Sequence, residues 1–147
     1  MDTELLAAIG EVAVGSARLE YAMAELAMAA RGLEGDKQLQ KLMKPRKVRD
    51  AFRELAAEHA DWRPFLRLWQ DCEAVLDDRN RLMHAVVVTA ADDTEQAHPE
   101  FWHVPSDSQV SIGPAAIKEH ARDIDRCVRR VMRLIPEAHQ RRAAAST

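Results

Sequence analysis

Residues 65–84 read FLRLWQDCEAVLDDRNRLMH, and the apolar positions in this stretch recur at steps of three and four residues. This period is that of an amphipathic α-helix that buries one face. The members of the apolar stripe are Phe65, Leu68, Trp69, Cys72, Val75 and Leu76. Two further steps place Arg79 with Asn80, and then Met83, on the same face. The stretch predicts a core helix that carries a polar pair within its buried stripe.

An arginine in a buried register needs a partner. Charged side chains are rarely buried unless they are paired, so we expect Arg79 to meet a carboxylate, a second chain or an anionic ligand. The alternative is that the stripe ends at Leu76 and that the polar residues after it form a solvated last turn.

A long first helix is predicted over residues 3–31. Its stripe alternates steps of four and three, as in a helical bundle, through Leu5, Ile9, Val12, Ser16, Leu19, Met23, Leu26 and Ala30. Gly32 and Gly35 supply the stop. Because such a length is unusual for a small domain, we expect part of this helix to protrude or to pack against a second subunit.

Prolines divide the rest of the chain. Pro45 separates a short helix from a longer one that ends near residue 60. Pro114 begins a last helix, which Pro136 is expected to end or kink. Residues 140–147 are then expected to form a frayed tail.

Between the third long helix, which should end near His84, and the last helix, the pattern changes. Residues 86–89 are a β-branched run, and residues 101–104 and 110–112 are short apolar runs separated by turn residues. Such runs are typical of a small hairpin or three-stranded flap. The sequence predicts an all-α single domain over residues 1–147, an up-and-down four-helix bundle with a β-hairpin insert at about 86–112.

Composition bounds the class of protein. The chain has 147 residues and a net charge of −3, which fits about one domain and argues against a constitutive nucleic-acid coat. No apolar run approaches the length of about 20 residues that a membrane span requires. Cys72 and Cys127 each fall on an apolar stripe, so we expect buried thiols in a reducing, cytoplasmic environment.

One segment is basic although the chain is acidic. Residues 36–53 carry many lysines and arginines against only Asp36 and Asp50. Lys44, Lys47 and Arg49 are predicted to point outward from the helix that follows Pro45. They are either an RNA-guiding surface or an ordinary solvated face.

The block from Asp78 to His84 resembles a motif of the HEPN superfamily (higher eukaryotes and prokaryotes nucleotide-binding), in which arginine and histidine are separated by four to six residues. The chain has two other matches to this spacing, Arg53 with His59 and Arg133 with His139. Only the first match has adjacent Arg-Asn and closes a predicted core helix. Ala85 stands where the family frequently has glycine.

The resemblance implies a homodimer that cleaves RNA without a metal or cofactor, with Arg79 and His84 as catalytic residues. Asn80 and Glu20, from the first helix, would support them. It also implies a toxin or phage-defence effector with an antitoxin partner. The alternatives are a non-catalytic HEPN-like module that binds a protein or nucleotide, and a purely structural dimer in which Arg79 pairs with Glu20 or Asp77.

The chemistry of these residues fits RNA cleavage. Imidazole can take the proton of a ribose 2′-OH, and guanidinium offers a planar fork to the phosphate. Arg79 and His84 lie about 140° apart on an ideal helix, so they converge only if the helix loosens or a two-fold axis brings them together. The alternative for His84 is a helix C-terminal cap. His98, Glu100 and His103 lack a further ligand, so no metal site is expected.

Overall fold

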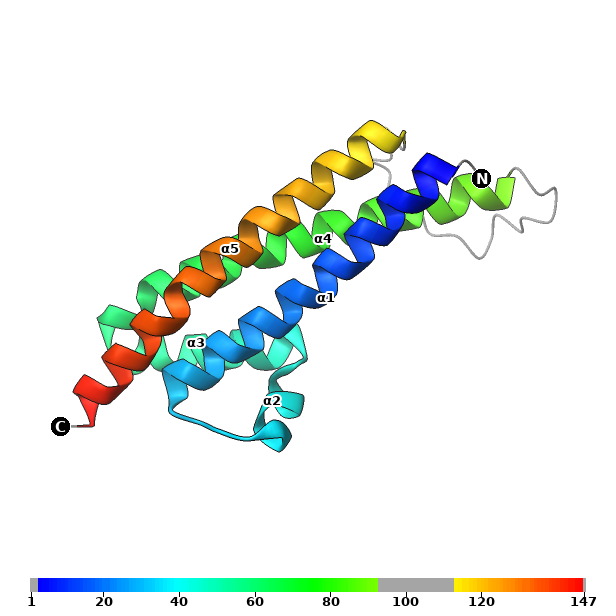
Figure 1. Ribbon diagram of the computed structural model, residues 1–147. Coiled ribbons are helices and arrows are strands. Elements are labelled where there is room, and N and C mark those ends of the chain that lie inside the picture. Colours follow the sequence, from blue (N-terminus) through cyan, green and yellow to red (C-terminus); the bar gives the residue numbers. More distant parts are fainter. Residues whose placement is uncertain (1–2, 93–112, 147) are drawn as a thin grey trace.

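The computed structural model describes residues 3–92 and 113–146. Their elements are α1 (Thr3–Arg31), α2 (Asp36–Leu42), α3 (Pro45–Glu58), the 3-10 turn η1 (Ala60–Trp62), α4 (Arg63–Asp92) and α5 (Pro114–Ala145). Every regular element in this part of the chain is helical, so the predicted all-α class is confirmed (Figure 1). No helix in these two ranges is long and apolar enough to cross a membrane.

Three long helices, α1, α4 and α5, lie side by side, and the shorter α3 packs near one end of them (Figure 1). The helices α1, α3 and α5 run in one direction and α4 runs in the opposite one. In an up-and-down bundle, consecutive long helices run in opposite directions. Here α1 and α3 run in the same direction, because the segment that contains α2 leads the chain back alongside α1 before α3 begins.

The most extensive packing joins α1 to α5, which are distant in sequence. A small residue allows their close approach at one point. A Cβ atom added at Gly15 would lie 3.2 Å from Ile124 Cγ2, which is closer than most real Cβ contacts. The stripe predicted for the first helix forms the α1 side of the core, where Val12, Leu19 and Met23 are almost completely buried.

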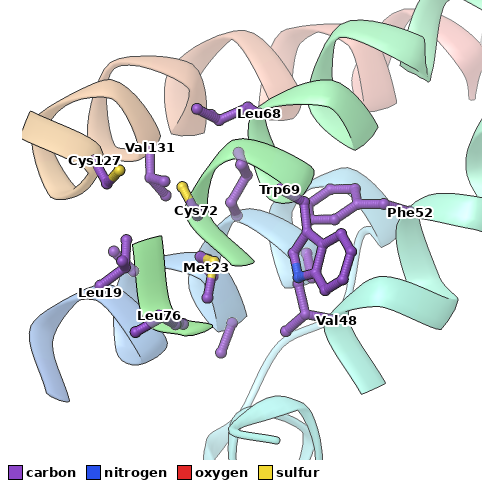
Figure 2. Close-up of a cluster of buried hydrophobic side chains, with 14 of the residues drawn as sticks. Leu19, Met23, Val48, Phe52, Leu68, Trp69, Cys72, Leu76, Cys127 and Val131 are labelled. Atoms are coloured by element: carbon purple, nitrogen blue, oxygen red, sulfur yellow. The ribbon is translucent and has the colours of Figure 1, made fainter. Parts of the chain in front are cut away.

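The core includes apolar side chains of α3 where this helix covers α1 and α4 (Figure 2). Phe52 of α3 stacks on Phe65 of α4, with ring centroids 6.5 Å apart. Figure 2 shows Val48 below the indole of Trp69, and Met23 of α1 to one side of it. Burial of such large apolar side chains contributes roughly 1.5–3 kcal/mol each. The narrow apolar face of α3 therefore fixes this helix onto α1 and α4.

The predicted boundaries around α1, α2 and α3 are confirmed. Helix α1 spans Thr3–Arg31, and Gly32 and Gly35 follow it with φ of +68° and +97°. Glycine adopts positive φ without the steric cost that other residues meet, so both positions favour glycine. Pro45 occupies the first turn of α3, where its missing N–H has no helical partner to lose.

The predicted end of the third long helix near His84, and the strand predicted at residues 86–89, are wrong. Helix α4 continues to Asp92, and Val86 is buried as a further member of its stripe. A short β-branched run carries only a weak preference for strand, and packing within a continuing helix overrides it. The rest of the predicted insert, residues 93–112, lies outside the described residues.

The predicted end of the last helix is also wrong. Helix α5 continues through Pro136 to Ala145, so residues 140–145 are helical. Proline inside a helix costs about 3 kcal/mol because it lacks an N–H and clashes with the preceding turn. Contacts beyond it offset that cost: Ala138 is fully buried, Arg141 donates to the Asp61 carbonyl oxygen (2.6 Å), and Arg142 donates to that of Arg31 (2.9 Å).

Candidate functional site

Arg79 occupies a position inside the buried stripe of α4. Leu76 before it and Leu82 and Val86 after it are buried. The alternative in which the stripe ends at Leu76 is therefore wrong. The Arg79 side chain is 22% exposed, so the guanidinium is partly withdrawn from water and needs polar partners.

Two side chains supply those partners. Arg79 Nη1 lies 3.3 Å from Glu20 Oε1, which reaches across from α1. Asn80 Oδ1 accepts hydrogen bonds from Arg79 Nε (3.1 Å) and Nη2 (2.8 Å). The structure thus brings together three of the four residues of the predicted site. The guanidinium is held from two sides, by a carboxylate and an amide.

This cluster lies in a groove of about 350 Å³ between α1 and α4. The groove is lined by Val12, Ala13, Ser16, Ala17, Glu20, Arg79 and Met83. Its α1 wall consists mostly of small side chains, so it is shallow and leaves Arg79 accessible. Helix α3 covers α1 and α4 near Met23 and Trp69, whereas the groove lies further along both helices.

His84 is exposed and lies within α4, eight residues before its end at Asp92. The alternative that His84 caps a helix C-terminus is therefore wrong, because the α4 turn at His84 is continuous. His84 does not line the groove, and a regular helix separates it from Arg79 by about 140°. The two predicted catalytic residues therefore do not converge within one chain. They could share a site only if Arg79 of one chain met His84 of a second chain across a two-fold axis.

The sequence prediction missed His120 of α5. Its Nε2 atom is buried and has no hydrogen-bond partner in the described part of the chain. Burial lowers the pKa of His120, and nearby Arg79 acts in the same direction, while Asp123 and Asp78 oppose the shift. His120 lies three residues after Ile117 and four before Ile124, which are both buried, so the helical period could have placed it on the inner face.

A second hollow, of about 680 Å³, lies between the end of α1, α2 and α3. Its cationic lining is Arg31, Lys37, Lys41, Lys44 and Lys47. We call these four lysines the lysine cluster. Among the described residues no carboxylate forms an ion pair with any of them. The two carboxylates that line the hollow have other partners: Glu54 pairs with Arg31, and Asp50 pairs with Arg49 (3.4 Å).

The lysine cluster shares two residues with the predicted RNA-guiding set. Lys44 and Lys47 line the hollow, whereas Arg49 does not line it and is held by Asp50. Lys37 and Lys41 were missed, although both lie in the basic segment of the sequence. Both lysines are on α2, and they reach the hollow because α2 packs near α3. The sequence does not show that packing.

No group of three or more His, Cys, Asp or Glu side chains in residues 3–92 and 113–146 is arranged to hold a metal ion. The weak candidate set His98, Glu100 and His103 lies outside those ranges.

The chain matches no protein-family model, no curated protein and no solved structure. Fold and site together define an all-α protein with a paired arginine in an open groove between two helices. The resemblance of residues 78–84 to the HEPN motif stays a prediction.

Proposed function

We propose that the protein is a HEPN-like endoribonuclease that acts as a homodimer and needs no metal. The observation that carries this proposal is the open groove with Arg79 in its wall. A guanidinium that is partly shielded, oriented from two sides and still accessible is suited to bind a phosphate.

The uncovered face of α1 supports a homodimer. Leu6 is 53% exposed, and Ala13 and Ala17 follow it at helical spacing on the same face as Glu20. A helix of a second copy could pack along this face of α1. It would cover α1 there as α3 covers the part of α1 near Met23. His84 follows the groove residue Met83 directly, so it stands at the rim where such a copy would approach.

In the proposed reaction, the His84 imidazole of one protomer removes the proton from a ribose 2′-OH. The 2′-oxygen then attacks the adjacent phosphorus, and the bond from phosphorus to the 5′-oxygen breaks. The products are a 2′,3′-cyclic phosphate and a 5′-OH. Arg79 of the other protomer stabilises the charge on the phosphate, while Asn80 and Glu20 hold its guanidinium in place.

The lysine cluster would guide the RNA. Glu20 and Arg31 are eleven residues apart on α1, which is about 16 Å and close to a whole number of turns. The groove and the lysine-lined hollow are therefore on nearly the same face of α1. A single strand bound along this face could have one phosphate at Arg79 and others at Lys44 and Lys47.

The remaining parts of the proposal have two sources. The sequence pattern and composition predict a four-helix bundle, in which α3 is the short member, a hairpin from the apolar runs at 101–104 and 110–112, and a cytoplasmic location. The role as a toxin or phage-defence effector that an antitoxin silences comes from the family resemblance.

A second candidate function is a HEPN-like module that binds a protein or nucleotide without cleaving RNA. The ion pair between Arg79 and Glu20 favours it, because the carboxylate already neutralises the guanidinium that catalysis would use. Since a fold does not determine an activity, the two candidates must be separated by experiment.

The test is RNA cleavage in the presence of EDTA by the wild type, Arg79→Ala and His84→Ala, with thermal unfolding measured in parallel. The proposal expects cleavage by the wild type to 2′,3′-cyclic phosphate ends, and a loss of at least about 100-fold in both variants while they remain folded. Arg133→Ala and His139→Ala are matched controls, since they remove the same residue types from another Arg/His pair far along α5.

Two outcomes would overturn the proposed enzyme. One is the absence of cleavage of any single-stranded RNA by the wild type. The other is cleavage that His84→Ala and His139→Ala retain equally. Binding of RNA or nucleotide without cleavage, weakened by Arg79→Ala, would instead support the second candidate.

A further inference from the structure

The two cysteines of the chain, 55 positions apart in sequence, meet in the core between α4 and α5. Both are free and buried, and Figure 2 shows their sulfur atoms pointing toward one another. Each thiol shifts the pKa of the other, as expected for two ionisable groups that lie close together. No third metal-ligating side chain in the described residues joins them, so a metal site does not explain the pair.

We propose that Cys72 and Cys127 are a redox modification site that a hydroperoxide converts reversibly to a disulfide. Because the two sulfur atoms point toward one another from neighbouring helices, side-chain rotations can bring them to bonding distance. This inference does not depend on the proposed ribonuclease activity.

The two thiols differ in a way that assigns their roles. Cys127 is 5% exposed and Cys72 is fully buried, so a small oxidant reaches Cys127 first. The neighbouring Cys72 thiol lowers the pKa of Cys127 to about 7, and the Arg130 guanidinium acts in the same direction. The Cys127 thiol, together with burial, raises the pKa of Cys72. Cys127 is therefore the nucleophilic thiol and Cys72 the resolving one.

The reaction has two steps. The Cys127 thiolate attacks the hydroperoxide, which breaks the O–O bond and leaves a sulfenic acid on Cys127 and hydroxide or alkoxide. The Cys72 sulfur then attacks the Cys127 sulfur, losing its proton and displacing water. With hydrogen peroxide the sum is two thiols and one peroxide giving one disulfide and two waters. A thiol such as dithiothreitol reverses it by exchange.

The disulfide would tie α4 to α5 within the core. Arg130 and Asp71 form an ion pair (2.9 Å) across the same two helices beside it, so the register is already held there. Cys72 lies two turns before Arg79, and Cys127 lies two turns after His120. Oxidation would stiffen the bundle close to the groove without using any of its residues.

The experiment treats the full chain, natively folded, with excess hydrogen peroxide. We expect a loss of two hydrogen atoms in the intact mass, a peptide linking Cys72 to Cys127, reversal by dithiothreitol, and a rise in melting temperature of about 5 °C or more. A gain of oxygen atoms without the cross-link, a disulfide between chains, or no reaction before unfolding would each overturn the proposal.

Two single variants test the assigned order. Cys72→Ser should accumulate a sulfenic acid on Cys127 that dimedone traps, because the resolving thiol is absent. Cys127→Ser should react much more slowly, because the remaining thiol is buried. Equal trapping of both variants would overturn the assignment, and the wild-type cross-link remains a measurement that does not depend on whether either variant folds.

Discussion

Arg79 Nη1 and Glu20 Oε1 lie 3.3 Å apart, although 59 residues separate them in sequence. Both side chains are less than one-third exposed. Helices α1 and α4 touch each other only slightly compared with α1 and α5, so this pair is a main link across the groove.

The link between Glu20 and Arg79 should be measurable as a coupling energy. Arg79→Met and Glu20→Gln are each expected to lower the free energy of unfolding by about 1–2 kcal/mol, since each leaves a partly buried polar group without its partner. The double variant should lose about 1 kcal/mol less than the sum. Urea unfolding of the four proteins measures this, and strict additivity would contradict the link.

A site shared between protomers predicts complementation. Arg79→Ala and His84→Ala should each be inactive alone. When the two are refolded together in equal amounts, half of the dimers are mixed and each has one complete site, so about a quarter of wild-type cleavage should return. If Arg79 and His84 act within one chain, the mixture stays inactive. Each variant refolded with itself is the control.

Protonation of His120 should destabilise the fold. Because its pKa is lowered in the folded state, the folded protein binds fewer protons than the unfolded one as the pH falls through the ordinary histidine range. Stability should therefore decrease as the pH falls below about 6.5. His120→Gln cannot be protonated, so its melting temperature should fall less between pH 7.5 and 5.5. An identical fall in both proteins would contradict the assignment.

The lysine cluster should set the salt dependence of RNA binding. Lys44→Ala and Lys47→Ala should each reduce the slope of log K against log salt by about 0.7, the value for one phosphate contact on a single strand. Arg49→Ala should change it less, because Arg49 is paired with Asp50. Arg133→Ala on the outer face of α5 is the control. Equal slopes in all four variants would show that these lysines are only a solvated face.

Replacing Pro136 should stabilise the protein. The residue is exposed and lies inside α5, so Pro136→Ala removes a steric clash and restores one N–H donor without loss of core packing. We expect the free energy of unfolding to rise by about 1–2 kcal/mol, since the greater freedom of the unfolded chain offsets part of the gain. A lower melting temperature would mean that a kink at Pro136 is needed for packing.

The parts of the fold that followed from the sequence are those with local causes. Positive-φ glycines end α1, Pro45 starts α3, and the three-four period of residues 65–76 marks the core face of α4. The errors at residues 86–89 and at Pro136 arose where local preference opposed a continuing helix. At both places tertiary contacts, the burial of Val86 and the bonds of Arg141, outweigh the local preference.

The site was predictable only in part, for a similar reason. The position of Arg79 within the apolar stripe of α4 indicated that its guanidinium needs a polar partner. In the structure that partner is Glu20. The neighbourhood of His120 and the meeting of Cys72 with Cys127 depend on the axial register of α5 against α4, and no spacing within one helix determines that register.

The pairing of α1 with α5 also bears on how the chain is made. During synthesis α1 emerges well before α5, the helix that covers most of its apolar face, because α4 and residues 93–112 lie between them. Until α5 has been translated, Val12, Leu19 and their neighbours remain open to solvent, to chaperones and to other nascent chains. Assembly of the native core is therefore expected to wait for α5, and variants that slow the docking of α5 should aggregate during expression even when the purified protein is stable.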